Sequence, residues 1–236
     1  MDNCLYCHQP LRHSSSWHHF FSPNHRVQLC HMCKEKLLKI SGELCQKCGR
    51  PLSALSPQYY QSGLCSDCQK WEQDAVYKGT LGQNRSLYLY NSFCKDVMAQ
   101  FKFRGDYALL HLFQSDWVTL YKQVYSPAYL LVPIPLSDER LYERGFNQSL
   151  ALAELLSSNI YEGLTRIHHE KQSKKSRGER LEMKSVFNVR DGSRLKSKDV
   201  VLIDDIYTTG MTLHAAAIVL KQAGANSVQS FTLARS

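Results

Sequence analysis

The stretch VVLIDDIYTTGMT (Val200–Thr212) combines three patterns that together indicate the fold. An unbroken apolar run, Val200–Ile203, is typical of a strand that is buried on both faces of a parallel sheet. Asp204 and Asp205 follow at the end of this run, and the hydroxyl-rich turn Thr208–Thr212 then leads into an apolar helical pattern. This order predicts a strand, a turn and a helix of an α/β sheet.

The same unit suits a ligand that carries both hydroxyls and a phosphate. In open α/β sheets, ligands bind beyond the carboxyl ends of the strands, where Asp204 and Asp205 are expected. Their carboxylates can accept hydrogen bonds from vicinal hydroxyls. Backbone N–H groups and hydroxyls at the start of a helix form an anion site, and its candidates are Thr208, Thr209, Gly210, Met211 and Thr212. A ribose 5-phosphate has both features.

Strand and helix patterns alternate from Asp74 onward, which predicts a parallel sheet with helices on both faces. We expect strands over Ser86–Asn91, Ala128–Leu136, Val200–Asp204 and Ser227–Arg235. We expect helices over Phe93–Phe103, Tyr107–Val124, Ser149–Ser158 and Thr212–Ala223. Gly224 lies just past the last helix, where a left-handed cap residue is common.

The N-terminal region is rich in cysteine, and eight of the nine cysteines form C-x-x-C pairs. The pairs are Cys4/Cys7, Cys30/Cys33, Cys45/Cys48 and Cys65/Cys68, while Cys94 stands alone and is expected to be a small buried residue. The motif C-x-x-C-x-x-P-L occurs twice, at Cys4–Leu11 and Cys45–Leu52. A second C-x-x-C follows after 22 and 16 intervening residues, respectively.

Two such pairs at this separation can form a tetrahedral thiolate site for structural zinc, so we expect one or two Zn²⁺ ions. The repeat favours sequential pairing, although the first pair could join the third and the second pair the fourth. A redox role, or a histidine such as His8 or His31 in place of a cysteine, is the alternative. We expect residues 1–72 to form a small zinc-ribbon-like module and residues 73–236 to form the α/β domain.

The net charge of the chain is +8, and nearly all of the surplus lies in residues 165–198, which hold eleven basic and four acidic residues. A cationic segment suits a polyanion such as nucleic acid, or a phosphorylated ligand. Our candidates for DNA contacts are Lys171, Lys174, Lys175, Arg177, Arg180 and Lys184. The alternative is a loop that only closes over a phosphorylated ligand.

The N-terminus has no signal-peptide pattern, and no apolar run approaches the roughly 18 residues of a membrane helix. We therefore expect a cytoplasmic protein without a transmembrane segment.

Several motifs together resemble the ComF family of competence proteins, in particular its ComFC branch. They are the cysteine region, FKFRGDYALL (Phe101–Leu110), VPIPLSDERLYERGFNQS (Val132–Ser149), EKQSKKSRGERLEMKSVFNV (Glu170–Val189) and VVLIDDIYTTGMT. The last motif resembles the phosphoribosyl-pyrophosphate (PRPP) signature of type I phosphoribosyltransferases. The resemblance covers essentially the whole chain, and it implies a type I phosphoribosyltransferase-like domain with an N-terminal zinc-binding module.

The resemblance also implies roles for individual residues. Asp204 and Asp205 would meet the ribose hydroxyls and help to organise Mg²⁺, and Thr208–Thr212 would surround the 5-phosphate. Arg140 and Arg144 would be partners of the pyrophosphate. The basic segment 170–184 would cover PRPP. Lys102 and Arg104 lie in a family motif, and the alternative is that they are ordinary solvated charges at a helix end.

The implied function is binding of single-stranded DNA and PRPP during uptake of transforming DNA. Its implied partners are a ComFA-type translocase and other competence machinery, which would recruit the protein to the inner face of the membrane. An active phosphoribosyltransferase acting on an unidentified base or amine is an alternative, as is a zinc-dependent docking module with a relic pocket. Because the sequence stops three residues after Leu233, we expect no C-terminal hood to grip a base.

Overall fold

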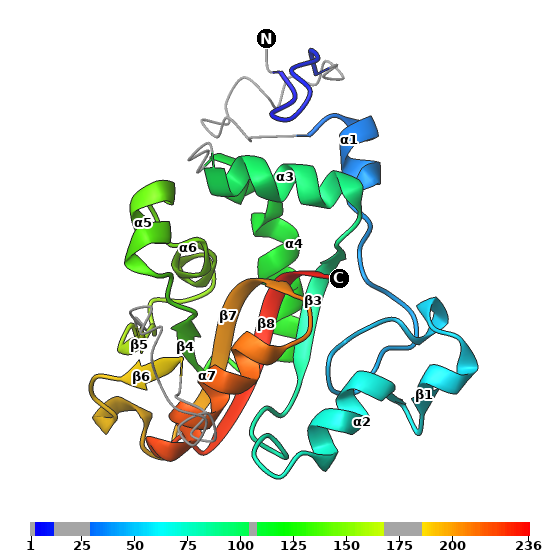
Figure 1. Cartoon of the computed structure of the whole chain (residues 1–236). Coiled ribbons are helices and arrows are strands. Elements are labelled where there is room, and N and C mark those ends of the chain that lie inside the picture. The colour runs from blue at the N-terminus through cyan, green and yellow to red at the C-terminus, as the bar shows by residue number, and fades with distance from the viewer. Residues whose placement is uncertain (1–2, 12–28, 104–107, 168–185) are drawn as a thin grey trace, which may run out of the picture.

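The computed structural model describes residues 3–11, 29–103, 108–167 and 186–236 (Figure 1). Its centre is a four-stranded sheet with the order β3-β8-β7-β4, and every neighbouring pair of strands is parallel. The strands are β3 (Asn84–Leu89), β4 (Leu130–Pro133), β7 (Asp199–Tyr207) and β8 (Ser227–Arg235). The predicted α/β class and parallel sheet are confirmed.

Helices cover both faces of the sheet, as the apolar strands required. They are α3 (Ser92–Phe103), α4 (Ala108–Val124), α5 (Asp138–Arg144), α6 (Gln148–Glu154) and α7 (Met211–Gln222). Successive side chains of β7 point to opposite faces. Val201 and Ile203 join a core with α3, α4 and α6, whereas Val200 and Leu202 join a second core with α7.

Trp117 is the largest fully buried side chain of the first core. Its ring stacks on Phe231 of β8 with centroids 3.8 Å apart, and its indole N–H donates to the Leu152 carbonyl oxygen at 3.0 Å. These contacts fix α4 and α6 against the same face of the sheet. They therefore position Ser149, which lies in the first turn of α6.

The N-terminal region consists of short elements on two sides of the sheet (Figure 1). They are α1 (His31–Lys36), η2 (Leu52–Ala54), η3 (Pro57–Tyr59), β1 (Tyr60–Gln61), β2 (Leu64–Cys65) and α2 (Ser66–Gln73). Cys4 and Cys33 join the core with α3 and α4, whereas Cys45 and Cys48 join the core with α7. The division into domains at residues 72 and 73 stays a prediction.

An antiparallel pair, β5 (Leu164–Arg166) and β6 (Phe187–Val189), borders the sheet, and the short helix η5 (Ser193–Leu195) follows it. The six basic candidates for DNA contacts, from Lys171 to Lys184, fall outside the described residues. Within the described ranges, no helix is both long and apolar enough to cross a membrane.

Several local features differ from the sequence-based expectation. Strand β4 is shorter than the predicted Ala128–Leu136, α6 ends at Glu154 and not at Ser158, and the pair β5–β6 was not predicted. Strand β7 continues to Tyr207 instead of ending at Asp204, because β8 pairs with it along this length, from Asp199↔Ser227 to Tyr207↔Arg235. Helix α5 was not predicted. Its signals are local: the Ser137 hydroxyl caps its start, and Gly145 ends it in the left-handed region at φ 75°.

Candidate functional site

Asp204 and Asp205 are each held by a side chain from another element. The Ser149 hydroxyl donates to Asp204 Oδ1 at 3.0 Å, and the backbone N–H of Asp205 donates to the same oxygen at 2.9 Å. Lys102 Nζ forms an ion pair with Asp205 Oδ2 at 2.5 Å. The remaining oxygens, Asp204 Oδ2 and Asp205 Oδ1, accept no hydrogen bond from a described residue, so each carboxylate retains an oxygen with acceptor capacity.

Two adjacent acids are tolerated here because their charges are reduced. Burial, together with the negative charge of Asp205, raises the pKa of Asp204 to about 7, although its hydrogen bonds and Lys102 act in the opposite direction. Lys102 compensates the charge of Asp205 directly. The pair therefore carries little net charge until a cation or hydroxyl donors arrive.

Sequence reasoning missed the partners of the two acids. Lys102 lies in the last turn of α3 and Ser149 in the first turn of α6, and both are distant from β7 in the chain. Their only signal was their position in the family motifs. Lys102 is therefore not an ordinary solvated charge, because its side chain is 16% exposed and paired. Arg104 falls outside the described residues.

The turn after β7 is tight and leads directly into helix α7. Gly210 lies in the left-handed region at φ 88°, and a Cβ atom there would overlap the hydroxyl of the buried Tyr207. The Thr209 hydroxyl accepts from the N–H of Met211 at 3.4 Å, and α7 then begins. Thr208 and Thr209 are exposed and Thr212 is half-buried. The first N–H groups of α7 lack partners within the helix, which suits an anion.

Cationic side chains gather on the α5 and β5 side of Asp204. Arg144 Nη1 donates to Gln148 Oε1 at 2.9 Å, whereas the Arg140 side chain is exposed. Arg166 was not predicted as a site residue. Burial and the positive charge of Arg140 lower the pKa of Arg166, and the negative charge of Asp204 raises it. Arg166 is thus within electrostatic range of both Arg140 and Asp204.

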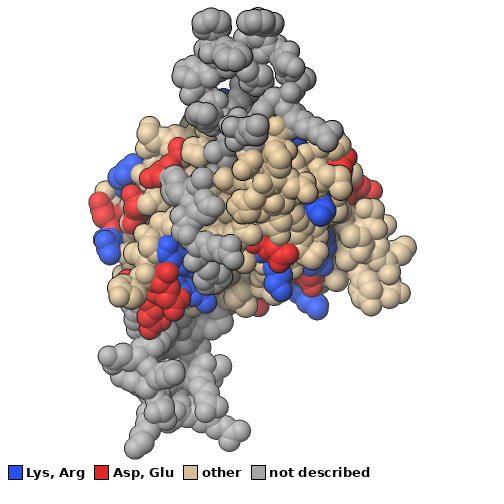
Figure 2. All heavy atoms as spheres, turned by 90° about the horizontal axis from the view of Figure 1, so that it is seen from above, with Lys and Arg blue, Asp and Glu red and all other residues tan. Residues whose placement is uncertain are grey.

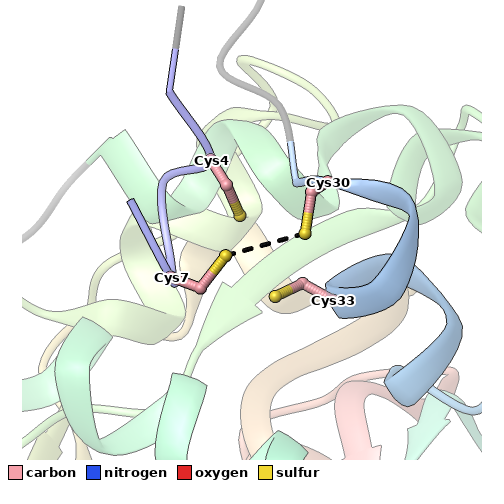
Figure 3. A group of neighbouring side chains, drawn as sticks. All are labelled: Cys4, Cys7, Cys30 and Cys33. Atoms are coloured by element: carbon pink, nitrogen blue, oxygen red, sulfur yellow. Dashed lines mark hydrogen bonds between the residues drawn. The ribbon is translucent and has the colours of Figure 1, made fainter. Parts of the chain in front are cut away.

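The eight C-x-x-C cysteines form two separate groups, and the grouping is sequential. The first group is Cys4, Cys7, Cys30 and Cys33, and the second is Cys45, Cys48, Cys65 and Cys68. The ligand atoms within each group lie within 4.8 Å of one another. Figure 3 shows the four side chains of the first group pointing toward a common centre. Neither His8 nor His31 belongs to a group.

Both groups fit structural zinc. Zinc–sulfur bonds of about 2.3 Å in a tetrahedron place the sulfurs about 3.8 Å apart. The sulfurs of Cys7 and Cys30 are 3.6 Å apart, as are those of Cys48 and Cys65. In the second group, hydrogen bonds from the neighbouring thiols hold the pKa of Cys45 well below its usual range. Hydrogen bonds with the neighbouring thiols raise the pKa values of Cys65 and Cys68, so zinc, which binds thiolates, must displace the protons of these two thiols.

Figure 2 shows the face seen from above, on the side of α3 and the first cysteine group. Among the residues described there, acidic and basic side chains are mixed, and they do not form one continuous cationic area. The net positive charge of the chain is therefore not concentrated among the described residues of this face.

Comparison with known proteins gives consistent matches. A family model described as the phosphoribosyl transferase domain matches residues 147–236, which include α7, β7, β8 and the turn. The competence protein ComFC of Bacillus subtilis is 42% identical over 235 residues, or 99% of this chain and 95% of the relative. ComFC of Streptococcus pneumoniae is 34% identical over 88% of this chain and 87% of its own length. Competence protein F of Haemophilus influenzae is 25% identical over 74% and 91%, respectively.

Proposed function

Because this chain belongs to the ComFC family of competence proteins, we propose that it acts in the uptake of transforming DNA and binds PRPP at the turn after β7. The observation that carries this proposal is the pair Asp204 and Asp205, held by Ser149 and Lys102 directly before a turn that leads into α7. Acceptors for hydroxyl groups and a helix start that suits a phosphate thus lie on one strand and on the turn that follows it.

In the proposed complex, Asp204 and Asp205 accept hydrogen bonds from the ribose hydroxyls. The 5-phosphate lies against Thr208, Thr209, Gly210, Met211 and Thr212. Arg140 and Arg144 bind the pyrophosphate, and Arg166 adds a third cation on that side. The N-terminal end of α7 contributes partial positive charge toward the phosphate.

Mg²⁺ would accompany PRPP, and the residues fit it. Mg²⁺ prefers oxygen ligands and usually combines one or two carboxylates with substrate phosphates. Asp204 Oδ2 and Asp205 Oδ1 have no described hydrogen-bond donor, so they can coordinate the ion directly or through water. The ion would also favour the ionised form of Asp204.

The two cysteine groups each bind one structural zinc ion in this proposal. Four thiolates leave no position open for a substrate, so the role of the metal is to stabilise the fold. Residues 1–72 form the zinc-binding module and residues 73–236 form the phosphoribosyltransferase-like domain. The module contributes to both cores of the sheet, so metal loss is expected to weaken both.

We further propose that the protein is cytoplasmic, binds single-stranded DNA and works with a ComFA-type translocase. The proposed DNA contacts are Lys171, Lys174, Lys175, Arg177, Arg180 and Lys184. Contacts to phosphates make binding salt-sensitive, with a slope of about 0.7 per contact for single strands. Replacing Lys174 and Lys175 by Ala should weaken binding and reduce the slope by roughly 1.4. Lys122→Ala, on the exposed side of α4, is the control. Unchanged affinity in the double variant would place the DNA surface elsewhere.

An active phosphoribosyltransferase with an unidentified base or amine acceptor is the second candidate. The acid pair favours it, because carboxylates that accept hydrogen bonds from the ribose hydroxyls would position the sugar for attack by an acceptor. The test measures release of pyrophosphate from PRPP with and without candidate acceptors, in the wild type and in Asp204→Ala/Asp205→Ala. Release that requires an acceptor and is lost in the variant supports the enzyme. PRPP binding without release supports the binding protein.

A further inference from the structure

Arg235, in β8, lies between the second cysteine group and the turn after β7. Its Nη2 donates to Cys48 Sγ at 3.6 Å, and its Nη1 donates to the Thr208 carbonyl oxygen at 3.0 Å and to that of Tyr207 at 3.5 Å. Nη1 also donates to the Ser236 oxygen. The guanidinium lies 4.7 Å from the centre of the Tyr207 ring. One side chain thus connects a thiol of the group to two carbonyls of the turn.

The contact between Arg235 and Cys48 is energetically important because Arg235 is buried. Arg235 is 3% exposed, and a buried guanidinium is costly unless an anion lies nearby. Within the described part of the chain, no Asp or Glu side chain forms a salt bridge with it. Cys48 is 2% exposed, and four thiolates on one zinc ion carry a net charge of about −2. The charge of a zinc-loaded cysteine group would therefore add to the Ser236 oxygen and the Tyr207 ring in stabilising Arg235 in this position.

Trp71 makes a second connection between the same two parts. It lies one helical turn after Cys68 in α2, and its indole N–H donates to the Thr209 carbonyl oxygen at 3.2 Å. Its ring stacks on that of the buried His214 in α7, with centroids 4.2 Å apart and an interplanar angle of 19°. The ring stack fixes Trp71 against α7, so the donor is held in place.

Hydrogen bonds to the Thr208 and Thr209 carbonyl oxygens fix the directions of the N–H groups that follow them in the turn. In a planar trans peptide, the C=O and the N–H of the next residue point in opposite directions. Arg235 holds the Thr208 carbonyl, and Trp71 holds the Thr209 carbonyl. The N–H groups of Thr209 and Gly210 therefore point away from Arg235 and Trp71, and a fixed orientation of these donors suits an anion at the helix start.

We propose that Arg235 and Trp71 are positioning residues that orient the phosphate-binding turn and couple it to the second cysteine group. Zinc bound at this group then raises the affinity of the turn for a phosphorylated ligand, and the bound ligand raises the affinity of the group for zinc. This inference rests on the proposed PRPP site. Coupling between two sites is reciprocal in affinity and typically amounts to about 5- to 150-fold.

The first test uses the wild-type protein loaded with zinc at both groups. The zinc is titrated at equilibrium against a chromogenic chelator of known affinity, with and without PRPP and Mg²⁺. We expect PRPP to raise the affinity for one of the two zinc ions by about 5-fold or more. Equal zinc affinity with and without PRPP, in protein that binds PRPP, would overturn the coupling.

The second test compares PRPP affinity in Arg235→Gln, Trp71→Phe and Arg85→Gln. Arg85 is the matched control, because its Nη1 donates to the Gln46 and Asn84 carbonyl oxygens beside the same cysteine group and does not contact the turn. We expect affinity to fall about 10-fold in Arg235→Gln and about 3-fold in Trp71→Phe, with both zinc ions retained, and to stay unchanged in Arg85→Gln.

Wild-type affinity in both test variants would overturn the positioning role. If Arg235→Gln does not fold, Trp71→Phe and the wild-type zinc titration decide the question. Absence of PRPP binding in the wild type would instead contradict the proposed function, and the coupling would fall with it.

Discussion

Lys102 Nζ lies 2.5 Å from Asp205 Oδ2, which ties the last turn of α3 to the strand that carries the acid pair. Both side chains are largely buried, at 16% and 14% exposure. The ion pair places a cation directly beside Asp205, next to Asp204, whose pKa is raised to about 7. The electrostatics of the candidate site are thus set jointly by α3 and β7.

Replacing Lys102 by Met should leave Asp205 without its cation. Removing one partner of a buried pair is costly, and the partial exposure here reduces the expected loss to about 2 kcal/mol of unfolding free energy. Urea denaturation measures it. Lys95→Met, on the exposed side of the same helix, should change stability by less than about 0.5 kcal/mol. Lys102→Met combined with Asp205→Asn should recover much of the loss, and no recovery would argue against the ion pair as its cause.

Asp204→Asn should stabilise the unliganded protein above neutral pH. The pKa of Asp204 is higher in the folded state than its ordinary value of 3.8, so the folded state retains a proton that the unfolded state releases. The contribution of this group to stability therefore falls as the pH rises from about 4 to about 7. The gain in Asp204→Asn should grow over this interval, to at most about 4 kcal/mol at pH 8.

The control for this experiment is Asp199→Asn, which should change stability in the opposite direction. Hydrogen bonds from Ser227 and Asn226 lower the pKa of Asp199, so its contribution is present above pH 4 and lost as the pH falls through the lowered pKa. Thermal unfolding across pH 4 to 8 measures both variants. A loss of stability in Asp204→Asn at pH 8 would contradict the raised pKa.

Gly210→Ala should weaken PRPP binding more than Gly79→Ala, which changes another glycine with a positive φ. Its φ of 88° is strained for alanine, and the added methyl group would overlap the buried Tyr207 hydroxyl. We expect PRPP affinity to fall at least about 10-fold. Gly79 has a similar φ of 69° and nothing within 4 Å of an added Cβ, so Gly79→Ala should cost only about 1 kcal/mol of stability and leave the affinity unchanged. An equal loss of PRPP affinity in the two variants would contradict a specific role of the turn in PRPP binding.

Elemental analysis should find two zinc ions per chain in the wild type and one in Cys48→Ser. The variant should also be cleaved faster in limited proteolysis between Cys45 and Cys68, because zinc binding contributes to folding. Cys94→Ser is the control, since Cys94 is buried but belongs to neither group. It should retain both ions. An unchanged metal content and cleavage pattern in Cys48→Ser would contradict the second site.

Local patterns were sufficient to predict the parts of the site that are close in sequence. The apolar run of β7, the turn at Gly210 and the start of α7 form one continuous segment, and C-x-x-C spacing with an internal repeat favoured the sequential cysteine groups. In each case the interacting atoms lie in residues that a short motif or a repeat specifies directly.

The contacts that couple distant segments could not be predicted in this way. Ser149, Lys102 and Arg235 reach the site only because α6, α3 and β8 have particular positions on the sheet. The extent of β7 also depends on pairing with β8, which overrides the low strand preference of aspartate. Register and helix placement are tertiary properties, and no local signal in the chain specifies them.

The most direct measurement is a calorimetric titration of PRPP, in the presence of Mg²⁺, into the wild type and into Asp204→Asn/Asp205→Asn. Hydrogen bonds to charged groups are worth about 1.5–3 kcal/mol each, so loss of both carboxylates should weaken binding by roughly 100-fold or more. Circular dichroism verifies that the double variant is folded. We expect saturable binding to the wild type and none detectable in the folded double variant. Equal affinity in both proteins would contradict the assignment of the acid pair and its turn as the PRPP site.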